Sequence, residues 1–253
     1  MRKPSFGGCG GTLGGSETGE APPRAVLFDY GLTLVTFRFP RAELVAAMEQ
    51  VRPWLGPDAP SAERLVDEVL LPIDRGLAEF DGCLDEVHYL DFFDRGWRRA
   101  GFEFPRDTLY RILDVEQRCW DEAAELAPDA LSTLDGLRAR GVRTGVCSNA
   151  PFPPEMVRRQ LCAKGITRRA DAVVLSSEVG RRKPAPELYE AALRALGVAA
   201  AETLYVGDKV REDFEGPRAM GMRAVLCTAL ARRQPPAEVP TITRLEELLQ
   251  WIP

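Results

Sequence analysis

The sequence predicts an α/β protein with a Rossmann-like parallel sheet and an inserted helical domain. Two observations lead to this prediction. Short, almost wholly apolar runs alternate with amphipathic helical patterns over the second half of the chain, and about 110 residues of mainly helical pattern separate the first apolar run from the second. Strands of a parallel sheet that is covered on both faces are near-continuously apolar. The alternation is therefore typical of a doubly wound sheet.

The predicted core elements follow in order along the chain. Five apolar runs predict strands at residues 25–29, 142–148, 172–176, 203–207 and 223–228. Helical periodicity predicts helices at residues 129–140, 154–164, 186–196 and 211–220. The segment "TRLEELLQWI" predicts a last helix at the end of the chain.

The interval after the first strand has helical periodicity and little strand character. Its four patterns are "PRAELVAAMEQV", "SAERLVDEVLLPIDRGLAEF", "LDEVHYLDFFDRGWRRA" and "RDTLYRILDVEQRCWDEAAEL". We expect a four-helix cap at residues 38–125, and a core made of residues 22–37 and 126–253. Residues 1–21 are rich in Gly and have no apolar stretch, so they predict a disordered tail.

Composition narrows the class of protein. Hydrophobic residues make up 45% and charged residues 28% of the chain, and no apolar stretch is long enough for a membrane helix. A net charge of −5 gives no general attraction to nucleic acid or anionic membranes. The six cysteines are scattered without a CxxC pair, which favours reduced thiols in a cytoplasmic protein over a disulfide or zinc framework.

Polar or charged groups are predicted at the carboxyl ends of four strands. They are Asp29, then Ser148 and Asn149, then Lys183, then Asp208 and Asp213. Ligands of open parallel sheets bind at this edge, so we expect these groups to converge on one crevice. Two carboxylates about 4 Å apart repel by roughly 4 kcal/mol at an effective dielectric of 20. The repulsion favours a Mg²⁺ ion together with Lys183, while Ser148 and nearby backbone N–H groups could hold phosphoryl oxygens.

Four segments resemble the motifs of the haloacid dehalogenase superfamily. The segments "FDYGLTL", "VCSN", "GRRKPAPELY" and "YVGDKVREDF" are most similar to members with a helical cap after the first motif, and the resemblance covers about residues 24–230. It implies a hydrolase that acts on a small phosphorylated metabolite, with Asp29 forming an aspartyl-phosphate. It also implies that Ser148, Asn149, Lys183 and Gly31 contact the phosphoryl group. The implied Mg²⁺ ligands are Asp29, Asp208 and the Gly31 carbonyl, with Asp213 acting directly or through water.

The chain departs from the family pattern at Gly31. Phosphatases of the superfamily usually carry a second Asp at this position as general acid, and such catalysis is worth about 10²–10⁴-fold. Phosphonate-cleaving relatives use a cap lysine, but residues 38–125 contain no lysine. A 2-haloacid dehalogenase, which needs no metal, and a non-catalytic or regulatory protein with the same fold stay open as alternatives.

The cap could supply the missing acid. In helical-cap relatives the substrate is read by the turn that corresponds to "EFDGCLDEVHY", which contains Asp81, Glu86 and His88, the last being the only histidine of the chain. We state as a hypothesis that one of these side chains donates the proton.

Overall fold

The computed structural model describes residues 21–252. The predicted tail lies outside these residues, except for its last position. A six-stranded parallel sheet forms the core, in the strand order β5-β4-β1-β6-β7-β8. Its strands are β1 (Ala25–Phe28), β4 (Arg143–Ser148), β5 (Ala172–Leu175), β6 (Thr203–Gly207), β7 (Arg223–Cys227) and β8 (Thr241–Ile242). The predicted α/β fold class is confirmed.

The central strand explains why the sheet strands are apolar throughout. On β1, Val26 and Phe28 belong to the hydrophobic cluster of one face, and Ala25 and Leu27 to the cluster of the other face. All four residues are fully buried. Burial of one large apolar side chain contributes about 1.5–3 kcal/mol, so both faces of β1 stabilise the sheet.

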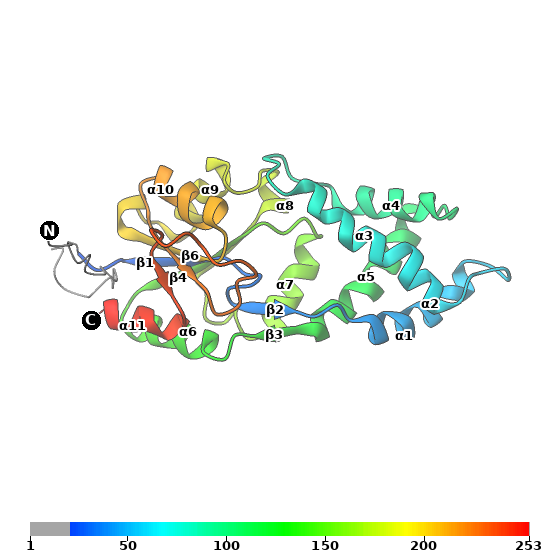
Figure 1. Cartoon of the computed structure of the whole chain (residues 1–253), viewed down its shortest axis with the longest axis horizontal. Helices are drawn as coiled ribbons and strands as arrows, with labels where there is room; N and C mark the ends of the chain where they lie inside the picture. The colour runs from blue at the N-terminus through cyan, green and yellow to red at the C-terminus, as the bar shows by residue number, and fades with distance from the viewer. Residues whose placement is uncertain (1–20, 253) are drawn as a thin grey trace, which may run out of the picture.

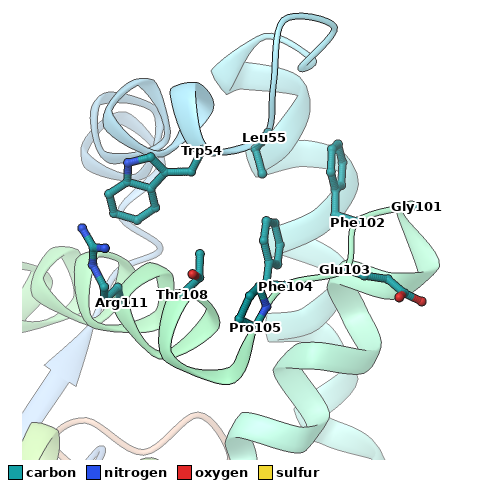
Figure 2. A pocket seen from close by; sticks show the side chains of 9 residues that line it. All are labelled: Trp54, Leu55, Gly101, Phe102, Glu103, Phe104, Pro105, Thr108 and Arg111. Atoms are coloured by element: carbon teal, nitrogen blue, oxygen red, sulfur yellow. The ribbon is translucent and has the colours of Figure 1, made fainter.

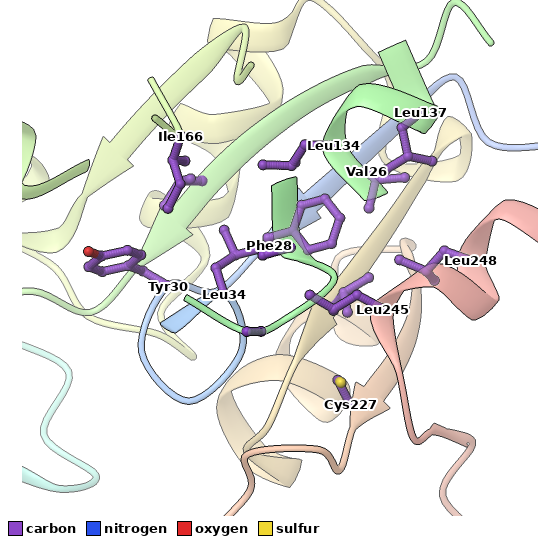
Figure 3. Packing of buried hydrophobic residues seen from close by; sticks show 14 of the residues in the cluster. Val26, Phe28, Tyr30, Leu34, Leu134, Leu137, Ile166, Cys227, Leu245 and Leu248 are labelled. Atoms are coloured by element: carbon purple, nitrogen blue, oxygen red, sulfur yellow. The ribbon is translucent and has the colours of Figure 1, made fainter. Parts of the chain in front are cut away.

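Helices cover both faces of the sheet, with α9 and α10 on one side and α6 and α11 on the other (Figure 1). The core helices are α6 (Ala130–Ala139), α7 (Pro154–Ala163), α8 (Ser176–Val179), α9 (Pro186–Leu196), α10 (Gly216–Ala219) and α11 (Leu248–Trp251). Figure 3 shows part of the hydrophobic cluster that contains Phe28, Leu34, Leu134 and Leu248.

Helix α9 shows how local sequence sets its bounds. Pro186 occupies the first turn, where its missing N–H leaves no hydrogen bond broken, and Gly197 ends the helix with φ +63°. Leu188, Tyr189 and Ala192 bury one face of the helix against the sheet. This packing fixes the loop before α9, which carries Lys183.

A helical region lies at the end of the molecule away from β7 and β8 (Figure 1). We call residues 41–123 the helical insert. It contains α1 (Arg41–Val51), α2 (Ala62–Leu65), α3 (Leu71–Gly76), α4 (Tyr89–Arg99) and α5 (Arg106–Ala123), and it has its own hydrophobic cluster. A π-helical turn (Val66–Leu70) joins α2 to α3, and 3₁₀ turns follow α1 (Arg52–Trp54) and α3 (Leu77–Phe80).

Two short strands connect the insert to the core. Strand β2 (Val35–Phe37) enters the insert and β3 (Ala124–Leu126) leaves it, and the two pair antiparallel. The sequence predicts neither strand, and its prediction that residues 124–126 end a helix is wrong. The pairing joins residues about 90 positions apart, so no local pattern announces it.

Two further helix predictions need correction. The helical pattern that starts at residue 84 overlaps the predicted turn at 79–89, and the turn prevails: α4 begins at Tyr89, because the backbone at 84–86 pairs with the core. The helix expected at residues 211–220 is a π-helical turn (Val210–Glu215) followed by α10. Within residues 21–252, no helix combines the length and the apolar character that crossing a membrane requires.

Candidate active site

The structure brings the predicted site residues together at the carboxyl edge of the sheet. Asp29 follows β1, Ser148 ends β4 and Asp208 follows β6, and β1 pairs with both β4 and β6. Lys183 reaches the same place from the loop between α8 and α9, and Asp213 from the π-helical turn after β6.

A buried lysine links two of the carboxylates. Lys183 Nζ lies 2.9 Å from Asp29 Oδ1 and 2.7 Å from Asp213 Oδ1, and its side chain is 2% exposed. Burial opposes the charged amine, but the carboxylates of Asp213 and Asp29 outweigh it and raise the pKa of Lys183 above its ordinary value. The lysine therefore stays charged between them.

The polar pair after β4 has two different roles in the structure. Ser148 Oγ donates a 2.7 Å hydrogen bond to Asp29 Oδ1. Asn149 instead brackets the Lys183 backbone, since its Oδ1 accepts from Lys183 N at 2.7 Å and its Nδ2 donates to Lys183 O at 3.2 Å. Asn149 thus holds Lys183 in place, and its contact with the phosphoryl group stays a prediction.

Asp213 organises the loop after β6. Its Oδ2 accepts hydrogen bonds from Asp208 N at 3.0 Å and Lys209 N at 2.9 Å, while Oδ1 binds Lys183. A Cβ atom on Gly207 would lie 2.3 Å from Asp213 Cγ, so only glycine allows this close approach. Asp213 thus anchors the loop that carries Asp208, and both of its oxygens already have protein partners.

Asp208 has a carboxylate oxygen that accepts no hydrogen bond from the described residues. Its Oδ1 is buried and has no hydrogen-bond partner among the described residues. Burial, followed by the charges of Asp29 and Asp213, raises the pKa of Asp208 to about 8. Buried polar atoms are normally paired, so Oδ1 calls for a positively charged or donating partner.

The three carboxylates fit a divalent cation. One oxygen each from Asp29, Asp208 and Asp213 can be chosen so that all three lie within 4.8 Å of one another. Hard cations such as Mg²⁺ prefer oxygen ligands of this kind, and a cation would satisfy Asp208 Oδ1. The donor set and the unpaired oxygen therefore suit the expected metal.

Gly31 lies in the loop between β1 and β2. A Cβ atom built there would meet only Phe37 Cε2, at 3.6 Å, which is an ordinary contact. The next residue, Leu32, has φ +58°, in the left-handed region that side chains other than glycine rarely adopt. The structure thus leaves room for a Cβ atom at the position where the general acid is missing.

The candidate acids of the insert lie where the insert meets the core. Asp81 Oδ1 is 3.7 Å from Lys209 Nζ, and Glu86 Oε1 accepts a 2.7 Å hydrogen bond from Arg182 Nη1. His88 is exposed and directly precedes α4. Among the described residues, no hydrogen bond or ion pair joins these three side chains to Asp29. Their role as proton donor stays a hypothesis.

Sequence reasoning missed two residues that support the site. Tyr205, on β6, accepts a 2.9 Å hydrogen bond from Lys183 Nζ and donates one to the Cys147 carbonyl. Arg182 binds Glu86 across the seam between core and insert. Tyr205 lies in an apolar strand, so the sequence pattern predicts only a core residue there. Arg182 directly precedes Lys183, and this position in the sequence is a signal that could have identified it.

A separate hollow of about 550 Å³ lies entirely within the helical insert (Figure 2). Trp54 and Arg111 line one side, with the Arg111 Cζ atom 4.6 Å from the Trp54 ring centroid. Phe102 and Phe104 contribute to its wall. None of its lining residues belongs to the carboxylate and lysine cluster, so we do not place the chemistry there.

The fold and this cluster define a hydrolase class. Residues 23–221 match the family model of the haloacid dehalogenase-like hydrolases. The chain belongs to this family, because the match spans well over half of its length.

Named relatives agree with that family. A phosphoserine phosphatase of Thermus thermophilus is 35% identical over 117 residues, which are 46% of this chain and 46% of that protein. The chain thus spans about half the length of that relative. A phosphatase of Mycobacterium tuberculosis is 29% identical over 80% of this chain and 86% of its own.

The structure of a 2-haloacid dehalogenase from Pseudomonas syringae superposes with a TM-score of 0.63. Its sequence is 22% identical, and the match covers 89% of this chain and 96% of that one. At this identity the likeness concerns the fold alone.

Proposed function

We propose that the protein is a Mg²⁺-dependent phosphohydrolase that acts on a small phosphorylated metabolite. The observation that carries the proposal is the cluster of Asp29, Asp208 and Asp213 oxygens within 4.8 Å, with a buried lysine between two of them. Such a site is suited to hold an anion only when cations balance the carboxylates. The relatives named as phosphatases support the same class of reaction.

Asp29 is the proposed nucleophile. Ser148 Oγ and Lys183 Nζ both donate to Asp29 Oδ1, which leaves Oδ2 for the substrate. A bond would form between Oδ2 and phosphorus while the bond from phosphorus to the ester oxygen breaks, and water would then hydrolyse the aspartyl-phosphate. Lys183 and Ser148 would each redirect the donor that now binds Asp29 Oδ1 to a phosphoryl oxygen when the substrate binds.

Asp29, Asp208 and the Gly31 carbonyl would hold the Mg²⁺ ion, with Asp213 supporting the loop that carries Asp208. The ion would supply positive charge where negative charge gathers on the phosphoryl group. The residues of the chain would perform the remaining tasks: Ser148 and Lys183 orient the nucleophile, and Asp213 keeps the amine of Lys183 charged.

Gly31 cannot protonate the leaving group. The proposed reaction is therefore slow with a basic leaving group, or it uses a leaving group that needs no proton. We also propose that residues 38–125 act as a cap that closes over the site, with β2 and β3 as the connecting hinge.

The test is a panel of phosphorylated metabolites and p-nitrophenyl phosphate, assayed with Mg²⁺ and with EDTA. We expect phosphate release that EDTA abolishes and added Mg²⁺ restores. Halide release from a 2-haloacid that persists in EDTA would identify a dehalogenase instead. Binding of Mg²⁺ without any turnover would identify a non-catalytic protein.

A further inference from the structure

Hydrogen bonds link the residue after Asp29 to the helical insert. Tyr30 Oη donates to Gln160 Oε1 at 2.8 Å, and Gln160 Nε2 donates to Asp121 Oδ1 at 3.1 Å. Gln160 lies on α7 of the core, and Asp121 lies in the last turn of α5 of the insert. We call these three side chains the Tyr30 network. It connects the nucleophile loop, which we define as residues 29–34, to the insert.

The Tyr30 network is shielded from solvent and runs in one direction. Tyr30 is 5% exposed, Gln160 is 7% exposed and the Asp121 side chain is 17% exposed. Both hydrogen bonds donate toward Asp121, whose other oxygen accepts from Arg159 Nε at 2.7 Å. Aligned hydrogen bonds polarise one another, and a buried polar group that loses its partner is costly. The network therefore fixes the position of the Tyr30 hydroxyl group.

Tyr30 also holds the nucleophile loop through its backbone and its ring. Its carbonyl oxygen accepts hydrogen bonds from Leu34 N at 3.0 Å and Val35 N at 3.1 Å, which closes the loop. Its ring packs edge-on against Phe37 on β2, with the ring centroids 6.1 Å apart. A residue that is held by its hydroxyl group, its ring and its carbonyl oxygen restrains the backbone on both sides of it.

We propose that Tyr30 is a positioning residue, which holds Asp29 and the Gly31 carbonyl in the geometry that binds Mg²⁺. Its anchor is the hydroxyl group, which is tied through Gln160 to Asp121. Tyr30 lies between the two proposed ligands in the sequence, so a displacement of Tyr30 moves both of them. This inference rests on the proposed function, and it adds that the insert, through α5, helps to shape a metal site whose proposed ligands all belong to the core.

Tyr110 offers a matched control for the Tyr30 hydroxyl group. It lies on α5 and donates its hydroxyl group to Glu155 Oε1 on α7, so it joins the same two helices. Within residues 21–252, this hydroxyl group bonds to no residue of the nucleophile loop. Tyr110→Phe therefore removes a hydrogen bond between α5 and α7 and leaves the Tyr30 network intact.

The experiment measures Mg²⁺ binding by isothermal titration calorimetry and turnover of p-nitrophenyl phosphate at saturating Mg²⁺. We expect Tyr30→Phe to raise the Kd for Mg²⁺ about tenfold, as the loss of groups that orient metal ligands commonly does. Its kcat should fall about tenfold while KM stays within about twofold, because a misplaced nucleophile slows the chemical step.

A second variant tests the link to the insert. Gln160→Met removes the middle of the Tyr30 network and should reproduce the effects of Tyr30→Phe. The double variant should be no worse than either single variant, because both substitutions break the same connection. Tyr110→Phe should keep the wild-type Kd and kcat.

Three results would overturn the inference. One is a lower melting temperature of Tyr30→Phe with a wild-type Kd for Mg²⁺ and a wild-type kcat, since Tyr30 would then only stabilise the fold. The others are equal effects of Tyr30→Phe and Tyr110→Phe, and additive effects of Tyr30→Phe and Gln160→Met.

Failure of the proposed function gives a different pattern. If the wild type binds Mg²⁺ but hydrolyses no ester, the proposed function fails, and the Kd comparison still supports or overturns the role of Tyr30. If the wild type binds no Mg²⁺, the proposed function and this inference both fail.

Discussion

The buried carboxylates of the core and of the helical insert are balanced differently. In the core, Asp29 and Asp213 share the buried amine of Lys183. In the insert, Glu116 on α5 is 3% exposed, accepts one hydrogen bond from Trp120 Nε1 at 3.2 Å, and leaves Oε2 unpaired. No ion pair within residues 21–252 involves Glu116.

This difference separates the tasks of the two regions. The core holds its charges in a fixed network, which is what a preorganised catalytic site requires. The insert has no lysine, and its buried Glu86 is neutralised by an arginine of the core. The insert thus depends on the core for positive charge wherever the two regions meet.

Removal of the proposed nucleophile should have the largest effect. Asp29→Asn keeps the shape of the side chain and an acceptor for Ser148, but it removes the attacking carboxylate. We expect turnover of p-nitrophenyl phosphate to fall at least about 10³-fold. Asp135→Asn, on the surface, is the control and should keep wild-type activity. Retention of activity by Asp29→Asn would place the chemistry elsewhere.

Loss of the shared amine should destabilise the core. Lys183→Met leaves Asp29 and Asp213 buried without their cation, and breaking a buried ion pair costs about 3–5 kcal/mol. We expect the free energy of unfolding in urea to fall by about this amount. Lys209→Met, which removes a half-exposed amine, should change it by less than about 0.5 kcal/mol. If both variants lower the free energy of unfolding equally, the buried amine of Lys183 does not stabilise Asp29 and Asp213.

Glu116 should make the insert sensitive to pH. Burial raises the pKa of Glu116 to about 7, and the nearby charge of Asp74 adds to the shift. The folded protein then holds a proton that the unfolded chain releases above about pH 4.5, so stability falls as pH rises from about 4.5 to about 7. Thermal or urea unfolding across this range measures the loss.

Glu116→Gln should remove this pH dependence. The amide resembles the protonated carboxyl group. The difference in the free energy of unfolding between Glu116→Gln and the wild type should therefore be on the order of 3 kcal/mol more favourable to the variant at pH 8 than at pH 4. Glu103→Gln is the control, since the Glu103 side chain is exposed. If the free energy of unfolding of the wild type changes with pH no more than that of Glu116→Gln, the pKa of Glu116 is not raised in the folded protein.

Restoring an acid beside Asp29 should increase turnover. The Cβ of Gly31→Asp would meet only one side-chain atom, at an ordinary distance, so the core can accept the substitution. We expect about a 10²-fold rise in kcat for esters with basic leaving groups, because positioned acid catalysis is worth at least this much. Gly31→Asn should give no such rise. An unchanged kcat in Gly31→Asp would indicate that another group already donates the proton.

Local patterns predicted the sheet and the convergence of charged groups at its edge. The five long strands and α9 were found within a residue or two, because continuous apolar runs and the Pro186 and Gly197 signals are local. Strand β8, with two residues, and the β2–β3 pair are too short to leave a pattern. The backbone at residues 84–86 is not helical because it forms hydrogen bonds with Gly180 and Arg182, which lie almost 100 positions away in the sequence.

The site was predictable in its members but less so in their contacts. Asp29, Ser148, Lys183 and Asp208 follow from the rule that ligands bind at the carboxyl edge of a parallel sheet. The contact of Tyr205 with Lys183, and the use of the Asn149 side chain to hold the Lys183 backbone, depend on three-dimensional packing. Sequence spacing carries no information on either contact.

The smallest predicted effect concerns strain next to the nucleophile. Leu32 adopts φ +58°, which costs a residue with a Cβ roughly 1–2 kcal/mol. Surrounding contacts must hold it there, and one of them is the 2.7 Å hydrogen bond from Leu32 N to Val35 O. Backbone strain of this kind clusters at functional sites and persists only where the surrounding structure holds the residue in place.

A comparison of two variants at this position isolates the backbone contribution. Leu32→Gly should be more stable than Leu32→Ala by about 1 kcal/mol, because both lose the same side-chain packing and only glycine adopts this φ without strain. The sign is reversed at the exposed Ala46 in the middle of α1, where Ala46→Gly should lower the free energy of unfolding by about 0.5–1 kcal/mol. If Leu32→Gly is instead the less stable variant of the pair, Leu32 is unstrained in the protein. The loop that carries Gly31 then holds no backbone strain at Leu32.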